Sequence, residues 1–204
     1  RDGQPLAPVA LRLVSGEGSY ATYETQSTPT IPIRTHLDEV TQGMHEIERQ
    51  GFDKPLVHII DREADSVGHL RQWKQAGYHW LIRVKGNTRL THQGQALTSQ
   101  TLAPTLTFER VRDVQHQGQP CEQWVVETTV RLTRPAKPSR KKSPKPEVAG
   151  EPLDARLIVS RLLTQGGTLL AEWFLLTNVD NVDAATLALW YYWRWRIESF
   201  FKLM

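Results

Sequence analysis

Residues 56–65 read Leu-Val-His-Ile-Ile-Asp-Arg-Glu-Ala-Asp. A short apolar run rich in β-branched residues is typical of a strand in the buried middle of a sheet, and this run ends at Asp61. Sheets of the α/β class bind their ligands at the carboxyl ends of their strands. The sequence therefore predicts a strand at 56–60 with a functional acid directly after it.

Helical and strand patterns alternate around this stretch. Residues 35–50 carry apolar side chains at helical spacing, as do residues 67–76, and residues 78–84 form a second apolar strand. A hairpin made of residues 9–15 and 20–24 precedes them. The order of hairpin, helix, strand, helix and strand indicates an α/β layer.

The pattern changes after Asn87. We expect no helix between residues 86 and 176, where the strand-like stretches are 106–114, 122–132, 155–162 and 168–176. From Asp183 to the last residue neither Gly nor Pro occurs, which predicts one long helix. The predicted organisation is the first part of a core at 1–85, an all-β insertion at 86–176 and the closing helix of the core at 177–204.

Composition limits the class of protein. The chain has 204 residues, 39% of them hydrophobic, and no stretch approaches the roughly 20 consecutive apolar residues of a membrane span. A single cysteine, Cys121, excludes an internal disulfide and a Cys-rich zinc site, and it fits a reducing compartment. No secretory signal opens the sequence. Because it starts without Met and stops inside an apolar run, we expect it to be a piece of a longer protein.

The positive charge is concentrated in one segment. Seven of the 25 Lys and Arg residues lie between Arg131 and Pro146, where no acid occurs, so the rest of the chain is net negative. Interspersed prolines in residues 134–146 oppose helix formation and strand pairing, which predicts a mobile surface loop. Such a loop is either a solvated linker or an arm that contacts nucleic-acid phosphates.

A second polar group lies on the predicted last helix. Tyr191, Arg194 and Glu198 are spaced i, i+3 and i+7, so they share one face. Asp61 and Glu198 could converge on Mg²⁺, which prefers oxygen ligands, and Arg194 offers a bidentate donor to a phosphate. Bound Mg²⁺ ions can stabilise the attacking and leaving oxygens of a phosphoryl transfer. The alternative is that Asp61 caps the following helix and that Arg194 and Glu198 form an ordinary surface pair.

Two motifs resemble those of a known family. Ile59-Ile60-Asp61-Arg62-Glu63-Ala64-Asp65 is similar to the second-aspartate motif of the DDE transposases of the insertion-sequence-four family. Tyr191-x2-Arg194-x3-Glu198 resembles the Tyr-Arg-Glu-Lys signature of that family, and Glu198 follows Asp61 by 137 residues. The resemblance implies an RNase H-like α/β fold, a mixed sheet with flanking helices that is interrupted by an all-β insertion subdomain.

The resemblance also implies roles for individual residues. Asp61 and Glu198 would be the second and third metal-binding acids. The residues expected to contact DNA are Arg83, Lys85, Trp173, Tyr191, Arg194 and Lys202. Trp173 would stack on a flipped base, since stacking on an aromatic ring offsets the loss of base stacking in the duplex. The alternatives are a core tryptophan at 173 and an exposed strand arginine at 83.

The sequence departs from the family pattern at two points. No acid precedes Asp61 at the separation that the first catalytic aspartate requires, and Asp2 lies too close to the next strand for that role. The lysine of the signature would fall one residue after Met204. Lys202 shares the face of Glu198, where it either reaches a phosphate or pairs with Glu198. We therefore expect the chain by itself to lack a complete catalytic metal site.

The function that the resemblance implies is cut-and-paste DNA transposition by metal-dependent cleavage and strand transfer. The expected cofactor is Mg²⁺, with Mn²⁺ as an alternative ion. The expected partners are transposon ends, target DNA and a second copy of the protein, in a bacterial cytoplasm at the nucleoid and without a membrane. The alternatives are a catalytically silent DNA-binding remnant of a transposase and another RNase H-like nuclease.

Overall fold

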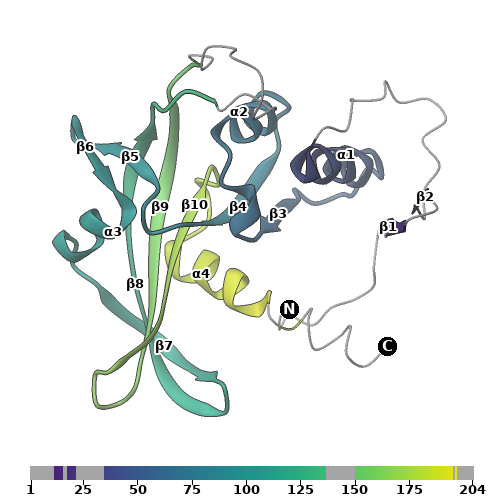
Figure 1. Cartoon of the computed structure of the whole chain (residues 1–204). Helices are drawn as coiled ribbons and strands as arrows, with labels where there is room; N and C mark the ends of the chain where they lie inside the picture. Colours follow the sequence, from purple (N-terminus) through teal and green to yellow (C-terminus); the bar gives the residue numbers. More distant parts are fainter. Residues whose placement is uncertain (1–11, 16–17, 22–34, 137–149, 195, 197–204) are drawn as a thin grey trace.

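A mixed β-sheet forms the centre of the molecule in the computed structural model, which describes residues 12–15, 18–21, 35–136, 150–194 and 196 (Figure 1). The sheet has eight strands in the order β3-β4-β10-β9-β8-β5-β6, and β7 also pairs with β8. The strands are β3 Val57–Ile60, β4 His79–Val84, β5 Arg89–His92, β6 Gln95–Thr98, β7 Glu109–His116, β8 Gln119–Leu132, β9 Leu153–Leu163 and β10 Leu169–Thr177. β3 and β4 are parallel and the other pairs are antiparallel.

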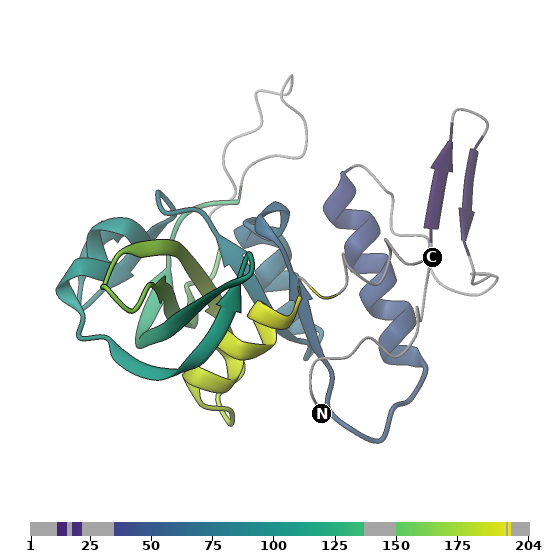
Figure 2. The same cartoon turned by 90° about the horizontal axis from the view of Figure 1, so that it is seen from below.

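Helices cover both faces of this sheet (Figure 2). The helices are α1 His36–Arg49, α2 Val67–Gln75, α3 Ser99–Leu102 and α4 Ala184–Trp193, with 3₁₀ turns η1 Arg62–Ala64 and η2 Ala103–Thr105. Because strand side chains alternate between faces, Trp80 and Ile82 of β4 pack with α1 and α2, whereas Leu81 packs with α4. β4 therefore belongs to both hydrophobic cores.

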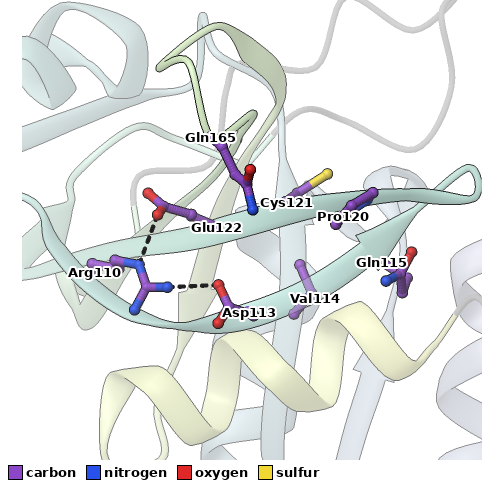
Figure 3. Close-up of a pocket in the computed structure, with 8 residues that line it drawn as sticks. All are labelled: Arg110, Asp113, Val114, Gln115, Pro120, Cys121, Glu122 and Gln165. Atoms are coloured by element: carbon purple, nitrogen blue, oxygen red, sulfur yellow. Dashed lines mark hydrogen bonds and ion pairs between the residues drawn. The ribbon is translucent and has the colours of Figure 1, made fainter.

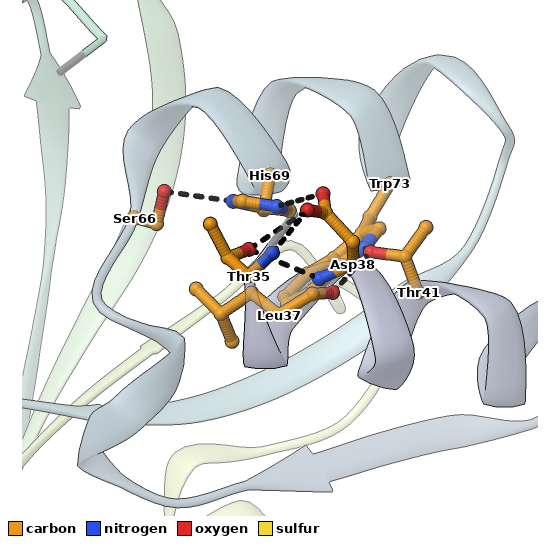
Figure 4. A network of polar contacts seen from close by, with 7 residues as sticks. All are labelled: Thr35, Leu37, Asp38, Thr41, Ser66, His69 and Trp73. Carbon is orange, nitrogen blue, oxygen red and sulfur yellow. Dashed lines mark hydrogen bonds and ion pairs between the residues drawn. The ribbon is translucent and has the colours of Figure 1, made fainter. Parts of the chain in front are cut away.

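Polar contacts hold α1 against α2 (Figure 4). Thr35 and Asp38 form a capping box at the start of α1, and Asp38 Oδ1 also lies 3.2 Å from His69 Nε2 on α2. The other ring nitrogen of His69 bonds to Ser66 Oγ at 2.9 Å. Deeper in the interface, the indole N–H of the fully buried Trp73 donates to Thr41 Oγ1 at 2.8 Å. These bonds fix α2, and with it the turn that precedes α2.

We expect Thr41→Val to lower the free energy of unfolding by about 1–3 kcal/mol, because it leaves the buried indole N–H of Trp73 without an acceptor while preserving side-chain volume. Urea denaturation measures the change. Thr91→Val is the matched control, since Thr91 bonds to Thr133 at an exposed position. An equal loss in the two variants would show that the buried bond to Trp73 is not the cause.

The helix and strand predictions of the first 85 residues are largely confirmed. The hairpin forms between β1 Arg12–Ser15 and β2 Gly18–Ala21, and the outer ends of the predicted strands, 9–11 and 22–24, lie outside the described residues. The placement of the strand at 56–60 in the middle of the sheet is wrong, because β3 is the last strand of the sheet in the described part of the chain. Its apolar composition has another cause: Ile60 packs in the core of α1 and α2, and Val57 and Ile59 pack in the core of α4.

Two further differences concern residues 86–176. The prediction that this region lacks helices is wrong, since α3 and η2 lie within it. The strands β8, β9 and β10 belong to the same sheet as β4, with Leu175 of β10 opposite Arg83 of β4. An insertion subdomain with the boundaries 86 and 176 stays a prediction.

The predicted long helix is present from Ala184 to Trp193, with Arg194 at its C-cap position, and residues 195 and 197–204 lie outside those that the structure describes. Within the described residues no helix has the length and apolar character that crossing a bilayer requires.

Candidate active site

Asp61 follows the last residue of β3 and opens the 3₁₀ turn η1. Its Oδ1 accepts a hydrogen bond from the backbone N–H of Arg62 at 2.7 Å. Asp61 therefore caps the 3₁₀ turn η1 and not the predicted helix at 67–76, which has Ser66 at its N-cap position. This cap uses only part of the carboxylate. The Asp61 side chain keeps 38% of its surface exposed, so its oxygens are accessible to further partners.

Two of these partners come from α4. The Tyr191 hydroxyl donates to Asp61 Oδ1 at 3.0 Å, and Arg194 Nη2 lies 3.0 Å from Oδ2. Asp183 caps the start of this helix by accepting from the Thr186 N–H at 2.8 Å. Burial of the apolar face of α4 then directs Tyr191 and Arg194, one turn apart, toward Asp61.

The third partner comes from β4. Arg83 Nη1 lies 4.0 Å from Asp61 Oδ1, and the side chain of Arg83 is only 17% exposed. In the parallel pair of β3 and β4, Ile60 lies opposite Ile82, so the residues that follow them emerge at the same edge of the sheet. The structure thus brings Asp61, Arg83, Tyr191 and Arg194 together at the carboxyl end of the strand, whereas the predicted convergence of Asp61 with Glu198 stays a prediction.

The charges of this cluster act on its ionisable groups. Partial burial raises the pKa of Asp61, but the Arg62 amide, Arg194, the Tyr191 hydroxyl and Arg83 outweigh it and hold the pKa below its ordinary value. Burial and the nearby Asp61 charge raise the pKa of Tyr191, which stays a protonated donor at neutral pH. Two guanidinium groups around one carboxylate leave a net positive charge, which favours a phosphate as the next ligand.

The other predicted site residues have different surroundings. Lys85 is exposed directly after β4. Trp173 is only 4% exposed and contacts the rings of Tyr191 at 5.9 Å and Tyr192 at 6.5 Å, which confirms the interpretation of a core tryptophan. Its role in stacking on a flipped base stays a prediction that requires this ring cluster to open. Glu198 and Lys202 lie outside the described residues, as does Asp2.

The carboxylates near Asp61 decide whether the cluster suits a divalent cation. Asp61 supplies carboxylate oxygens of the kind that Mg²⁺ prefers, on a side chain that is 38% exposed. In the ranges that the structure describes, no group of three or more His, Cys, Asp or Glu side chains could hold a metal ion. Asp61 therefore fits as one ligand, and the remaining carboxylates must come from residues beyond the described ones, with Glu198 as the candidate in this chain.

Three polar residues near the site were not predicted. Asp65 Oδ2 accepts from Thr88 Oγ1 at 2.7 Å, and its Oδ1 forms an ion pair with Arg134. Asp65 lies in the motif of Asp61, but nothing in the sequence identifies its partners, which are 23 and 69 residues away.

The pair of Arg134 with Asp65 also concerns the basic segment that begins at Arg131. Arg131 likewise pairs with Asp154 at 2.6 Å. Two of the seven cations of the basic segment are thus neutralised within the protein.

A separate hollow of about 250 Å³ lies between the hairpins β7–β8 and β9–β10 (Figure 3). Arg110 lies 2.6 Å from Asp113 and 3.0 Å from Glu122, so the one arginine of this hollow is paired with its two acids. Its lining residues include none of those around Asp61. The hollow has no evident part in the chemistry of the Asp61 cluster.

Comparison with known proteins agrees with this geometry. Residues 34–204 match the family model described as "Transposase DDE domain". Comparison with curated protein sequences gave no match. The matched family consists of metal-dependent, transposition-related nucleases that act on DNA, and the match covers Asp61 and the whole of α4. The chain therefore belongs to the transposase DDE domain family.

Proposed function

We propose that this chain is the catalytic domain of a cut-and-paste transposase of the insertion-sequence-four family. The observation that supports this most directly is the contact of Tyr191 and Arg194 with Asp61, from which Tyr191 is separated by 130 residues of sequence. Two motifs that were matched separately in the sequence meet at one carboxylate.

The residues of the cluster have distinct parts in this reaction. Asp61, together with Glu198 and an acid from outside the described residues, would hold Mg²⁺ or Mn²⁺. The bound ion supplies activation of water and charge stabilisation at the cleaved phosphodiester. Tyr191 and Arg194 hold the Asp61 carboxylate in one orientation, and the positive charge of Arg83 and Arg194 attracts the DNA phosphate.

Cut-and-paste transposition requires its chemical steps in a fixed order. The first hydrolysis frees a 3′-hydroxyl at the transposon end, which then attacks the opposite strand and later the target DNA. Two ends must be held together, so we propose a homodimer in the assembly that joins them. We place the protein at the bacterial nucleoid, where its DNA substrates are.

The deciding experiment uses the protein expressed from its complete reading frame and a plasmid that carries the element's two ends. A transposase gives Mg²⁺-dependent cuts at the ends and joined products with a target plasmid. A plain nuclease gives cuts without joining. A silent remnant binds the ends but cuts nothing, and that result would reject the proposed function.

The basic segment provides a further prediction. We expect charge reversal at its five cations outside the two ion pairs to flatten the salt dependence of DNA affinity, by about 0.9 in log–log slope for each phosphate that the protein no longer neutralises. These cations are Lys137, Arg140, Lys141, Lys142 and Lys145. Fluorescence anisotropy between low and high salt measures the slope, and Lys54→Glu is the control at an exposed position. An unchanged slope would show that the segment is a linker.

A further inference from the structure

Asp65 ends the turn that begins at Asp61, and its carboxylate is more deeply buried than that of Asp61. Its side chain is 10% exposed, and both of its oxygens have partners. Thr88, which follows β4, donates to Oδ2, and Arg134 at the end of β8 pairs with Oδ1. Three elements that are distant in the sequence therefore meet at this side chain.

The backbone of Arg134 is also held, by a hydrogen bond from helix α2. Its carbonyl oxygen accepts from Arg71 Nη2 at 3.1 Å, and Arg71 Nε also donates to the carbonyl of Glu151 at 2.7 Å. A Cβ atom on Gly150 would lie 2.4 Å from Arg71 Nη1, so only glycine leaves room for this guanidinium. The end of β8 and the start of β9 are thus joined on helix α2 beside Asp65.

The turn between the two aspartates is short and hydrogen-bonded. Ala64 N–H donates to the Asp61 carbonyl at 3.0 Å, and Asp65 N–H donates to the Arg62 carbonyl at 3.4 Å. A single 3₁₀ turn has few degrees of freedom, so a shift at one end moves the other. The orientation of Asp61 toward Tyr191 and Arg194 depends on where Asp65 is held.

We propose that Asp65 and Arg134 are positioning residues for the catalytic Asp61, a proposal that rests on the proposed function. A buried ion pair contributes little net stability, because the loss of hydration offsets the attraction of the charges. Its directional bonds nevertheless fix geometry, and small displacements of a catalytic group lower the rate strongly. The pair controls the rate of the cleavage step rather than the affinity for DNA.

The test compares Asp65→Asn, Arg134→Met and Arg134→Lys in the protein with its complete reading frame. We expect kcat for end cleavage to fall about 10- to 100-fold in Asp65→Asn and Arg134→Met, with the dissociation constant for end DNA unchanged. The double variant should lose no more than either single variant, because the two residues act as a unit. Arg134→Lys keeps the charge and should recover part of the rate.

Arg161 and Glu172 supply a matched control. They form an ion pair at 2.7 Å, and the side chain of Arg161 is 26% exposed, as is that of Arg134. Arg161→Met and Glu172→Gln should leave kcat unchanged. Circular dichroism at the assay temperature shows whether each variant is folded, and assays at lower temperature test whether a lost rate returns with the fold.

Three results would overturn the proposal: an unchanged kcat in Asp65→Asn, an equal loss in the Arg161 control, or recovery of the full rate once the variant is as folded as the wild type. Absence of metal-dependent cleavage in the wild-type protein would instead reject the proposed function, and this proposal with it. The two failures are therefore distinguishable.

Discussion

Asp61→Asn is expected to lower DNA cleavage by about 10³-fold or more, since a bound metal ion contributes several kcal/mol of charge stabilisation and each 1.4 kcal/mol is tenfold in rate. Asparagine keeps the shape of the side chain and an oxygen that can accept from the Arg62 N–H. It lacks the negative charge that a divalent cation requires and that pairs with Arg194. Gel assays of end cleavage measure the loss.

Two further variants show whether this loss of cleavage comes from the metal site. Glu198→Ala should lower cleavage to the same extent while leaving DNA binding largely intact, because in the proposed function the two acids hold the same ions. Asp53→Asn, at an exposed position nearby in the sequence, should cleave like the wild type. Cleavage that persists in Glu198→Ala would remove Glu198 from the mechanism, and cleavage that persists in Asp61→Asn would reject the metal site as a whole.

The elements of the site were predictable because their signals are local. The apolar run before Asp61 predicts a strand, and the helical spacing of Tyr191 and Arg194 predicts one polar face on one helix. Each pattern depends only on neighbours a few residues away. Their meeting at one carboxylate was not predicted, because the resemblance implied contacts of Tyr191 and Arg194 with DNA phosphates, and the structure shows their bonds to Asp61.

What the sequence left open depends on pairing across the fold. Strand β3 has the composition of a central strand because both of its faces are covered, and composition does not reveal whether a strand has one neighbour or two. The burial of Trp173 depends on α4 packing over β10. The pair of Asp65 with Arg134 joins residues that share no local pattern.

One missed element did have a local signal. Gln93 and Gly94 both have positive φ in the turn between β5 and β6, as do Gln117 and Gly118 between β7 and β8. Two consecutive residues of this kind form the turn that matches the twist of a two-stranded hairpin, and glycine at the second position is its usual mark. The Gln-Gly pair between two short stretches is therefore the local signal of the β5–β6 hairpin.

Arg194→Ala is expected to lower end cleavage by about 100-fold and affinity for end DNA by about tenfold, since a hydrogen bond to a charged group contributes about 1.5–3 kcal/mol. Arg194 lies 3.0 Å from Asp61 Oδ2, so its loss frees the carboxylate to rotate. The same guanidinium would contact a phosphate of the transposon end, so both measurements should change. Arg110→Ala, which breaks an ion pair in the separate hollow, is the control.

Arg194→Lys separates these two contributions. Lysine keeps the positive charge but lacks the planar fork that binds two oxygens at once. Affinity for DNA should therefore return toward the wild-type value, because attraction to phosphates depends mainly on charge. Cleavage should stay low, because a flexible ammonium group does not fix the orientation of Asp61. Full cleavage in Arg194→Lys would show that charge alone is required at position 194 and that Asp61 is oriented by Tyr191 and the turn that ends at Asp65.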